Sequence, residues 1–145
     1  MPGIDECLLH AMRLPGVRGA ALVDWTSGLA LGTVGDAAGA DHETAATETA
    51  ELARMAAEHP TFAPAADEEP TGREGAGPGT SPGSAKTPPI EDLVVTTRTC
   101  YHVLRFVETS FDSSVLLHLW LDRVEGNLAL ARLRMRDLTE RLVLE

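Results

Sequence analysis

Residues 16–35 read GVRGAALVDWTSGLALGTVG, and their pattern is the clearest indication of the fold in the sequence. Two apolar runs, 17–24 and 29–34, flank a polar turn at 25–28 that ends in a glycine. Such a turn between two apolar runs is typical of a β-hairpin. Trp25 sits at the tip of the hairpin, where it either packs against a neighbouring helix or stays exposed as an interface residue.

A helix is predicted on each side of this hairpin. Ahead of it, apolar residues at positions 4, 8 and 12 indicate a short amphipathic helix that ends at the Pro-Gly pair 15–16. After it, residues 42–59 predict a longer helix with Asp41 as the N-cap. One face of this helix is almost all alanine, which allows close packing on a sheet, and Leu52 and Met55 lie on its flank.

Residues 60–89 interrupt the pattern with a segment rich in proline and glycine. This segment contains seven of the nine prolines and five of the thirteen glycines. Its apolar residues are too few to offset the entropy of ordering the chain, so we expect a long disordered loop inserted after the second helix.

The second half of the sequence predicts three strands and a final helix. The apolar runs 90–99, 100–108 and 113–122 are separated by short polar turns and indicate an antiparallel meander. From Val124 to Leu142, apolar residues are spaced by four and three, which predicts an amphipathic helix. The element order α-β-β-α-loop-β-β-β-α predicts an α+β fold, in which residues 1–145 form one domain. We expect a five-stranded antiparallel sheet with helices on both faces.

Composition excludes several classes of function. The 145 residues carry a formal net charge of −10, which disfavours binding to nucleic acid or to anionic lipid. No apolar run approaches the roughly 18 residues of a membrane span, and the N-terminus lacks the basic region of a secretory signal. Cys7 and Cys100 lie far apart in the sequence and are expected to be free thiols. These features predict a cytoplasmic protein.

The sequence contains no evident catalytic or cofactor site. Neighbouring acids such as Glu91 and Asp92 would point to opposite faces of a strand and read as solvated surface, not as an acid/base pair. His102 and His118 fall in adjacent predicted strands, where they could face each other, but no third metal ligand stands nearby. The glycines match no phosphate-binding motif. We therefore expect a protein that is not an enzyme and has no catalytic residue, metal or cofactor.

Two stretches of the sequence resemble the roadblock family, the dynein light-chain roadblock type that has many bacterial relatives. Residues 16–35 are similar to the hairpin of that family, and residues 122–142, DRVEGNLALARLRMRDLTERL, are similar to its closing helix. The resemblance covers essentially the whole chain apart from the long loop. Relatives have a short connection at that point.

The resemblance implies a homodimer. In this family two third strands pair edge to edge, and the second helices lie together on one face. Here that interface would contain Leu93, Val94 and Val95 of the third strand, with Leu52 and Met55 of the helix. An edge strand as apolar as 93–95 is also prone to aggregation unless another strand covers it, so the physical argument agrees with the resemblance.

The resemblance further implies a non-enzymatic adaptor or regulator of a small Ras-like GTPase. Bacterial relatives accompany such GTPases, including GTPase systems associated with sensor histidine kinases. Residues 36–58 hold six acids and one base, and they offer either a solvated helix face or an acidic docking surface. We expect Arg54 to pair with its neighbours Glu51 and Glu58. The predicted partner-binding residues are Glu43, Thr47, Glu51, Arg54 and Glu58. A PAS-like or profilin-like module, acting as a ligand sensor or scaffold, is the alternative.

Overall fold

A computed structural model describes residues 2–39, 41–62, 90–107 and 114–144 of the chain. The helices and strands are, in chain order, α1 (Pro2–Ala11), β1 (Val17–Asp24), β2 (Leu29–Gly35), α2 (His42–Glu58), the 3₁₀ turn η1 (Pro60–Phe62), β3 (Asp92–Thr96), β4 (Cys100–Val107), β5 (Val115–Asp122) and α4 (Leu128–Leu144).

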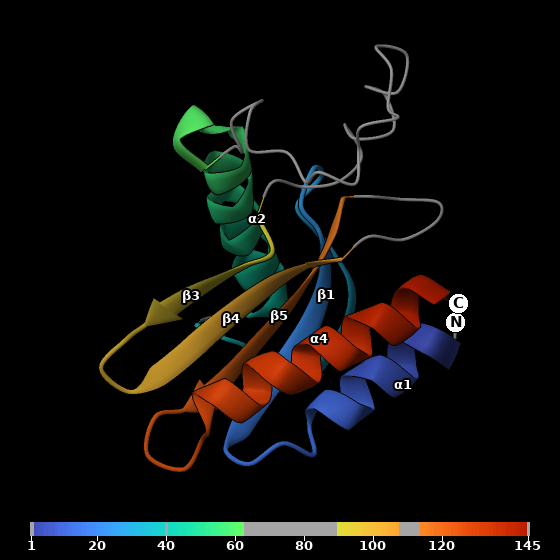
Figure 1. Cartoon of the computed structure of the whole chain (residues 1–145), viewed down its shortest axis with the longest axis vertical. Helices are drawn as coiled ribbons and strands as arrows, with labels where there is room; N and C mark the ends of the chain where they lie inside the picture. The colour runs from blue at the N-terminus through green and yellow to red at the C-terminus, as the bar shows by residue number, and fades with distance from the viewer. Residues whose placement is uncertain (1, 40, 63–89, 108–113, 145) are drawn as a thin grey trace, which may run out of the picture.

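The five strands form a single antiparallel sheet in the order β2-β1-β5-β4-β3 (Figure 1). The hairpin β1–β2 therefore joins the meander β3–β4–β5 through the pairing of β1 with β5. This confirms the predicted sheet and its class. Within the described residues, β2 and β3 form its two edges.

Helices α1 and α4 lie side by side on one face of the sheet, and α2 lies on the other (Figure 1). The α1–α4 face covers the larger core cluster, whose fully buried side chains include Leu22, Leu117, Leu119 and Met135. These large aliphatic residues remove much apolar area from water, which is the main stabilising contribution to the fold.

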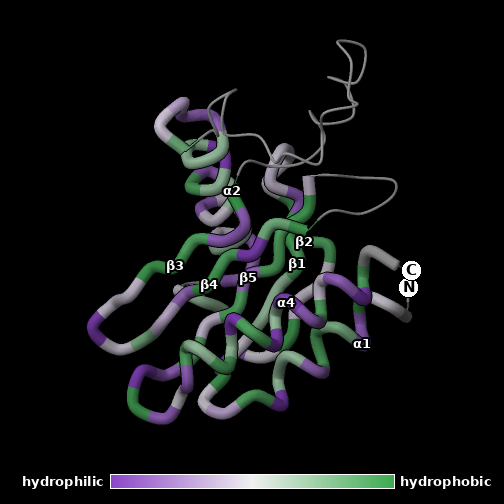
Figure 2. The backbone as a smooth tube through the Cα atoms, in the orientation of Figure 1, coloured by the Kyte–Doolittle hydropathy of each residue, from purple (hydrophilic) through white to green (hydrophobic). Residues whose placement is uncertain are grey.

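Helix α2 packs through its alanine face, as the sequence predicts. Its buried residues are Ala45, Ala46, Thr49, Ala50, Ala53 and Ala56. Small side chains let the helix approach β1 and β2 closely. Figure 2 shows that hydrophobic and hydrophilic positions both occur along α2. The carboxylate of Asp41 accepts a hydrogen bond from the N–H of Thr44 at 2.7 Å, which confirms the predicted N-cap.

The boundaries of several elements differ from the sequence prediction. Strand β3 begins at Asp92 and ends at Thr96, so it is shorter than the apolar run 90–99. Val124 is 90% exposed and lies in a turn, since α4 begins only at Leu128, where Asn127 accepts a hydrogen bond from the N–H of Leu130. The apolar spacing therefore begins before the helix does. Such spacing shows which residues share a face, but it does not show where the helix is capped.

The predicted disordered loop of residues 60–89 falls mostly outside the described residues, which exclude 63–89. Its first residues, Pro60–Phe62, form a 3₁₀ turn instead, with the N–H of Phe62 donating to the carbonyl of His59. No helix in the described ranges is long and apolar enough to cross a membrane.

Candidate functional site

The edge strand β3 brings three of the predicted interface residues together. Val94 and Val95 are 37% and 38% exposed, whereas Leu93 is half-buried and packs against the core beneath α2. Side chains alternate along a strand. Val95, opposite His102, therefore faces the α2 side, and Val94, opposite Val103, faces the α4 side. Both faces of the edge are consequently apolar.

The backbone of β3 has one hydrogen-bonding side free among the described residues. The N–H of Thr97 donates to the carbonyl of Cys100 at 2.8 Å, which fixes the pattern of the β3–β4 ladder. Because hydrogen-bonded pairs alternate along an antiparallel ladder, Val95 also bonds to β4. Val94 and Thr96 then direct their N–H and C=O groups outward, away from the sheet. This is the arrangement that a further strand can pair with.

A groove of about 300 Å³ runs between α2 and the β3–β4 end of the sheet. Leu52 of α2 and Val95 of β3 both line it, so the structure brings these two predicted interface residues into one surface. Met55, on the next part of α2, is 58% exposed. Phe62, at the end of η1, is 53% exposed, although the sequence placed it in the disordered loop.

His102 and His118 meet in the wall of this groove. His102 Nδ1 lies 3.1 Å from His118 Nε2, so one nitrogen donates and the other accepts a hydrogen bond when both rings are neutral. Burial, with a smaller contribution from neighbouring His102, lowers the pKa of His118 to about 3. Burial also lowers the pKa of His102. The sequence allowed these two rings to face each other, and the structure brings them into contact, with 5.3 Å between their centroids.

The pair of His102 and His118 does not belong to a metal centre formed by the described residues. Within the described part of the chain no three His, Cys, Asp or Glu side chains cluster in a way that could hold a metal ion. Trp120 stacks near both rings, with its centroid 4.9 Å from that of His118 and 6.4 Å from that of His102. Of these three rings, those of His102 and His118 line the groove, and Trp120 is buried.

The predicted partner-binding residues separate into two sets. Glu43, Thr47, Glu51 and Glu58 are exposed on the outer face of α2. Arg54 is instead half-buried, and its Nη1 donates a hydrogen bond to the backbone carbonyl of Trp25 at 2.8 Å.

The expected pairing of Arg54 with Glu51 and Glu58 is therefore wrong. Among the described residues no ion pair involves Arg54. A backbone carbonyl in the adjacent hairpin gives the guanidinium a partly buried acceptor, and sequence neighbours on an exposed helix face offer only weak surface pairs.

Trp25 packs against the sheet. Its ring meets that of Phe106 of β4 edge-on, with 5.7 Å between centroids. The indole is partly buried and packs against the core beneath α2, as do Ala57, Ile90 and Leu93. Its backbone carbonyl holds Arg54, so this turn of the hairpin fixes the position of α2 over the sheet.

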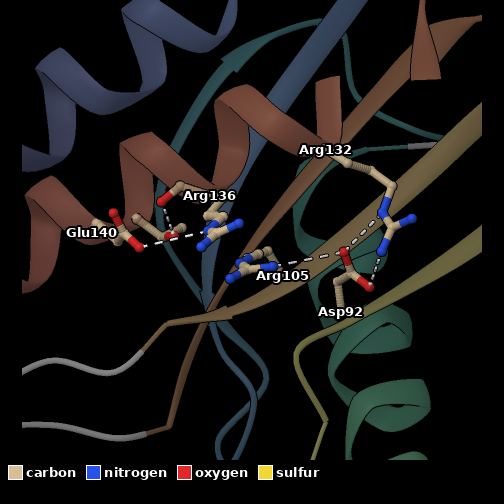
Figure 3. Close-up of polar contacts among 6 residues, drawn as sticks. Asp92, Arg105, Arg132, Arg136 and Glu140 are labelled. Carbon is tan, nitrogen blue, oxygen red and sulfur yellow. Dashed lines mark hydrogen bonds and ion pairs between the residues drawn. The ribbon is translucent and has the colours of Figure 1, made fainter. Parts of the chain in front are cut away.

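Asp92 anchors the start of the edge strand to α4. Figure 3 shows its carboxylate between two guanidinium groups, those of Arg105 and Arg132. Arg132 donates to it through Nε at 3.0 Å and through Nη2 at 3.2 Å, and Arg105 Nη1 lies 3.8 Å away. The Asp92 side chain is only 11% exposed, so the interpretation of this residue as solvated surface is wrong. The ion pair between Asp92 and Arg132 joins residues 40 positions apart in the sequence, so no local sequence pattern reveals it.

Comparison with known proteins identifies the fold. No family model matches the sequence, and no curated protein does. Several solved structures are similar over almost the whole chain. The gliding protein MglB of Thermus thermophilus has a TM-score of 0.65 and 16% identity, over 98% of this chain and 87% of that one.

Two further similar structures support the same conclusion. An MglB described with a tetrameric arrangement has a TM-score of 0.66 and 17% identity, over 97% of this chain and 85% of that one. A Roadblock/LC7 domain from Streptomyces avermitilis has a TM-score of 0.56 and 16% identity, over 95% and 92%. Together with the element order and the sheet topology, these similarities show that this chain has the roadblock fold.

Proposed function

We propose that the protein is a non-enzymatic adaptor that forms a homodimer and binds a small Ras-like GTPase in the cytoplasm. The observation that carries the proposal is the open edge of β3, which has exposed Val94 on one face and Val95 on the other. An apolar edge with outward backbone groups is complementary to a second copy of itself around a two-fold axis.

In the proposed dimer, two β3 strands pair antiparallel through the outward groups of Val94 and Thr96. Leu52 and Met55 of each α2 would then cover apolar surface next to the new strand pair, since Leu52 and Val95 already line one groove. Pairing through the edge would shield side chains on both faces of β3 that the described residues of one chain leave exposed to water.

The acidic face of α2 is the proposed contact for the GTPase. Glu43, Glu51 and Glu58 are exposed there and would be present twice in the dimer. A small GTPase supplies its own phosphate-binding loop and Mg²⁺, so a regulator needs only to order the switch regions of its partner. Because Arg54 is hydrogen-bonded to the carbonyl of Trp25, we do not expect it to insert into the partner and accelerate GTP hydrolysis.

Support for this partner comes from the resemblance of residues 16–35 and 122–142 to roadblock proteins, which accompany small GTPases. The same resemblance suggests a place in a signalling system linked to a sensor histidine kinase. An adjacent gene for either protein is the simplest observation that would strengthen this part of the proposal.

The test has two measurements on the full chain. Sedimentation velocity at tens of micromolar should give a dimer, and titration with a small GTPase encoded beside this protein should show binding that depends on whether GDP or GTP is bound. A monomer would contradict the dimer. If no such GTPase binds in either nucleotide state, the ligand-sensor alternative is favoured, with the groove of His102 and His118 as its site.

A further inference from the structure

A second groove, of about 390 Å³, is lined by residues of α1, of the turn that follows it and of α4. These two helices lie side by side on the face of the sheet opposite α2 (Figure 1). Its apolar lining includes Leu14 and Leu130, which are half-buried, and Leu138, which is 8% exposed. A side chain placed in this groove would therefore meet an apolar floor.

Three exposed arginines, Arg13, Arg134 and Arg141, line the same groove. Asp137 is the one carboxylate among the lining residues, so three positive charges against one negative give a local charge of +2, with His10 counted as neutral. The whole chain carries −10. The groove is thus locally cationic in a strongly acidic protein.

The groove arginines differ from the other arginines of this face. Arg105 and Arg132 pair with Asp92, and Arg136 lies 3.7 Å from Glu140. None of the three groove arginines makes an ion pair with a carboxylate of the described residues. Their guanidinium groups keep the forked donor geometry that suits carboxylates.

We propose that the α1–α4 groove binds an acidic segment of a partner protein. An apolar side chain of that segment would occupy the floor, and flanking carboxylates would pair with Arg13, Arg134 and Arg141 at the rim. The apolar floor favours a peptide over a phosphate polymer, whose backbone offers no apolar group to bury there. Because α2 and β3 lie elsewhere on the fold, this second partner could bind together with the proposed GTPase.

The test uses a fluorescein-labelled peptide of Leu-Glu-Glu-Glu repeats, whose binding to the full chain is measured by fluorescence anisotropy. Saturable binding is expected, and it should weaken as salt increases. Arg134→Glu should lower the affinity by about tenfold or more. The matched control is Arg136→Glu, which makes the same charge change on the same helix outside the groove and should alter the affinity by less than about twofold. Arg141→Glu is a second groove variant and should behave like Arg134→Glu.

Four outcomes would overturn the proposal. The first is no saturable binding by the unmodified protein. The second is an equal loss in the groove and control variants, which would indicate attraction by net charge alone. The third is Arg134-dependent binding of pyrophosphate or of phosphatidylserine vesicles that is tighter than binding of the peptide. The fourth is a fall in sedimenting mass on Arg134→Glu, which would assign the groove to a second copy of this chain.

Discussion

The guanidinium of Arg54 in α2 and the backbone carbonyl of Trp25 in the β1–β2 turn are joined by a hydrogen bond of 2.8 Å. This contact spans 29 residues of sequence and places the only arginine or lysine of α2 against the sheet. Glu43, Glu51 and Glu58 are left on the outer face of α2 without an arginine or lysine from the same helix beside them.

Replacing Arg54 should affect stability more than GTP hydrolysis by a bound partner. Arg54→Ala removes a partly buried charged donor, so we expect a loss of about 1–2 kcal/mol in the free energy of unfolding, measured by urea denaturation. GTP hydrolysis by the partner should stay within a few-fold. A loss of about a thousandfold, typical of an arginine finger, would refute the positioning role.

Val94→Pro should weaken the dimer and leave the protomer folded. Its N–H points away from β4, so proline removes a group that the proposed second copy would bind. The matched variant Val95→Pro removes an N–H from the β3–β4 ladder and should lower the melting temperature instead. Sedimentation and thermal denaturation of both variants separate the two effects. Equal dimerisation of Val94→Pro and the unmodified protein would contradict pairing through this edge.

Asp92→Asn should loosen the edge strand. The change removes a nearly buried carboxylate bound by Arg132, and we expect about 1–3 kcal/mol of destabilisation and faster amide exchange in β3. The control Glu140→Gln breaks the exposed pair with Arg136 and should cost less than about 0.5 kcal/mol. If amide exchange in β3 were as slow in the Asp92 variant as in the unmodified protein, the ion pairs of Asp92 would not be needed to hold the strand.

His118 should make the fold sensitive to acid. The pKa of His118 is about 3 in the folded chain against an ordinary value of 6.5, so the unfolded chain binds the proton first. The free energy of unfolding therefore falls as pH drops below 6.5, and at pH 5 the loss reaches about 2 kcal/mol.

His118→Leu removes this titration, so its stability should fall less than that of the unmodified protein between pH 6.5 and pH 5. The control is the exposed His59→Gln, which should keep the original pH dependence. Chemical denaturation at both pH values is the measurement. Parallel pH profiles for His118→Leu and the unmodified protein would exclude His118 as the cause.

Charge reversal on α2 should slow association with the GTPase. Replacing Glu43, Glu51 and Glu58 by lysine removes the exposed acidic face, so the association rate should fall by about tenfold or more and its dependence on salt should flatten. Glu125→Lys, in the exposed turn before α4, is a control for charge change elsewhere. An unchanged rate would place the GTPase contact on another surface.

Local patterns in the sequence were enough to predict the strands and the main helices, their order and the class of the sheet. Alternation and helical periodicity are local properties, and so are the Asp41 cap, the alanine face of α2 and the apolar edge at Val94 and Val95. Each depends on residues within a few positions of one another, so a single sequence reveals them.

The contacts between side chains that are distant in the sequence depend on how the elements pack together. Arg54 binds Trp25 instead of its helical neighbours, and Asp92 is enclosed by Arg132 instead of being solvated. The cationic groove needs α1 and α4, from opposite ends of the chain, to lie side by side. The partners of Arg54 and Asp92 depend on the order of the strands and on the placement of the helices. In the sequence many residues are equally suitable partners, and packing brings only particular ones within hydrogen-bond distance.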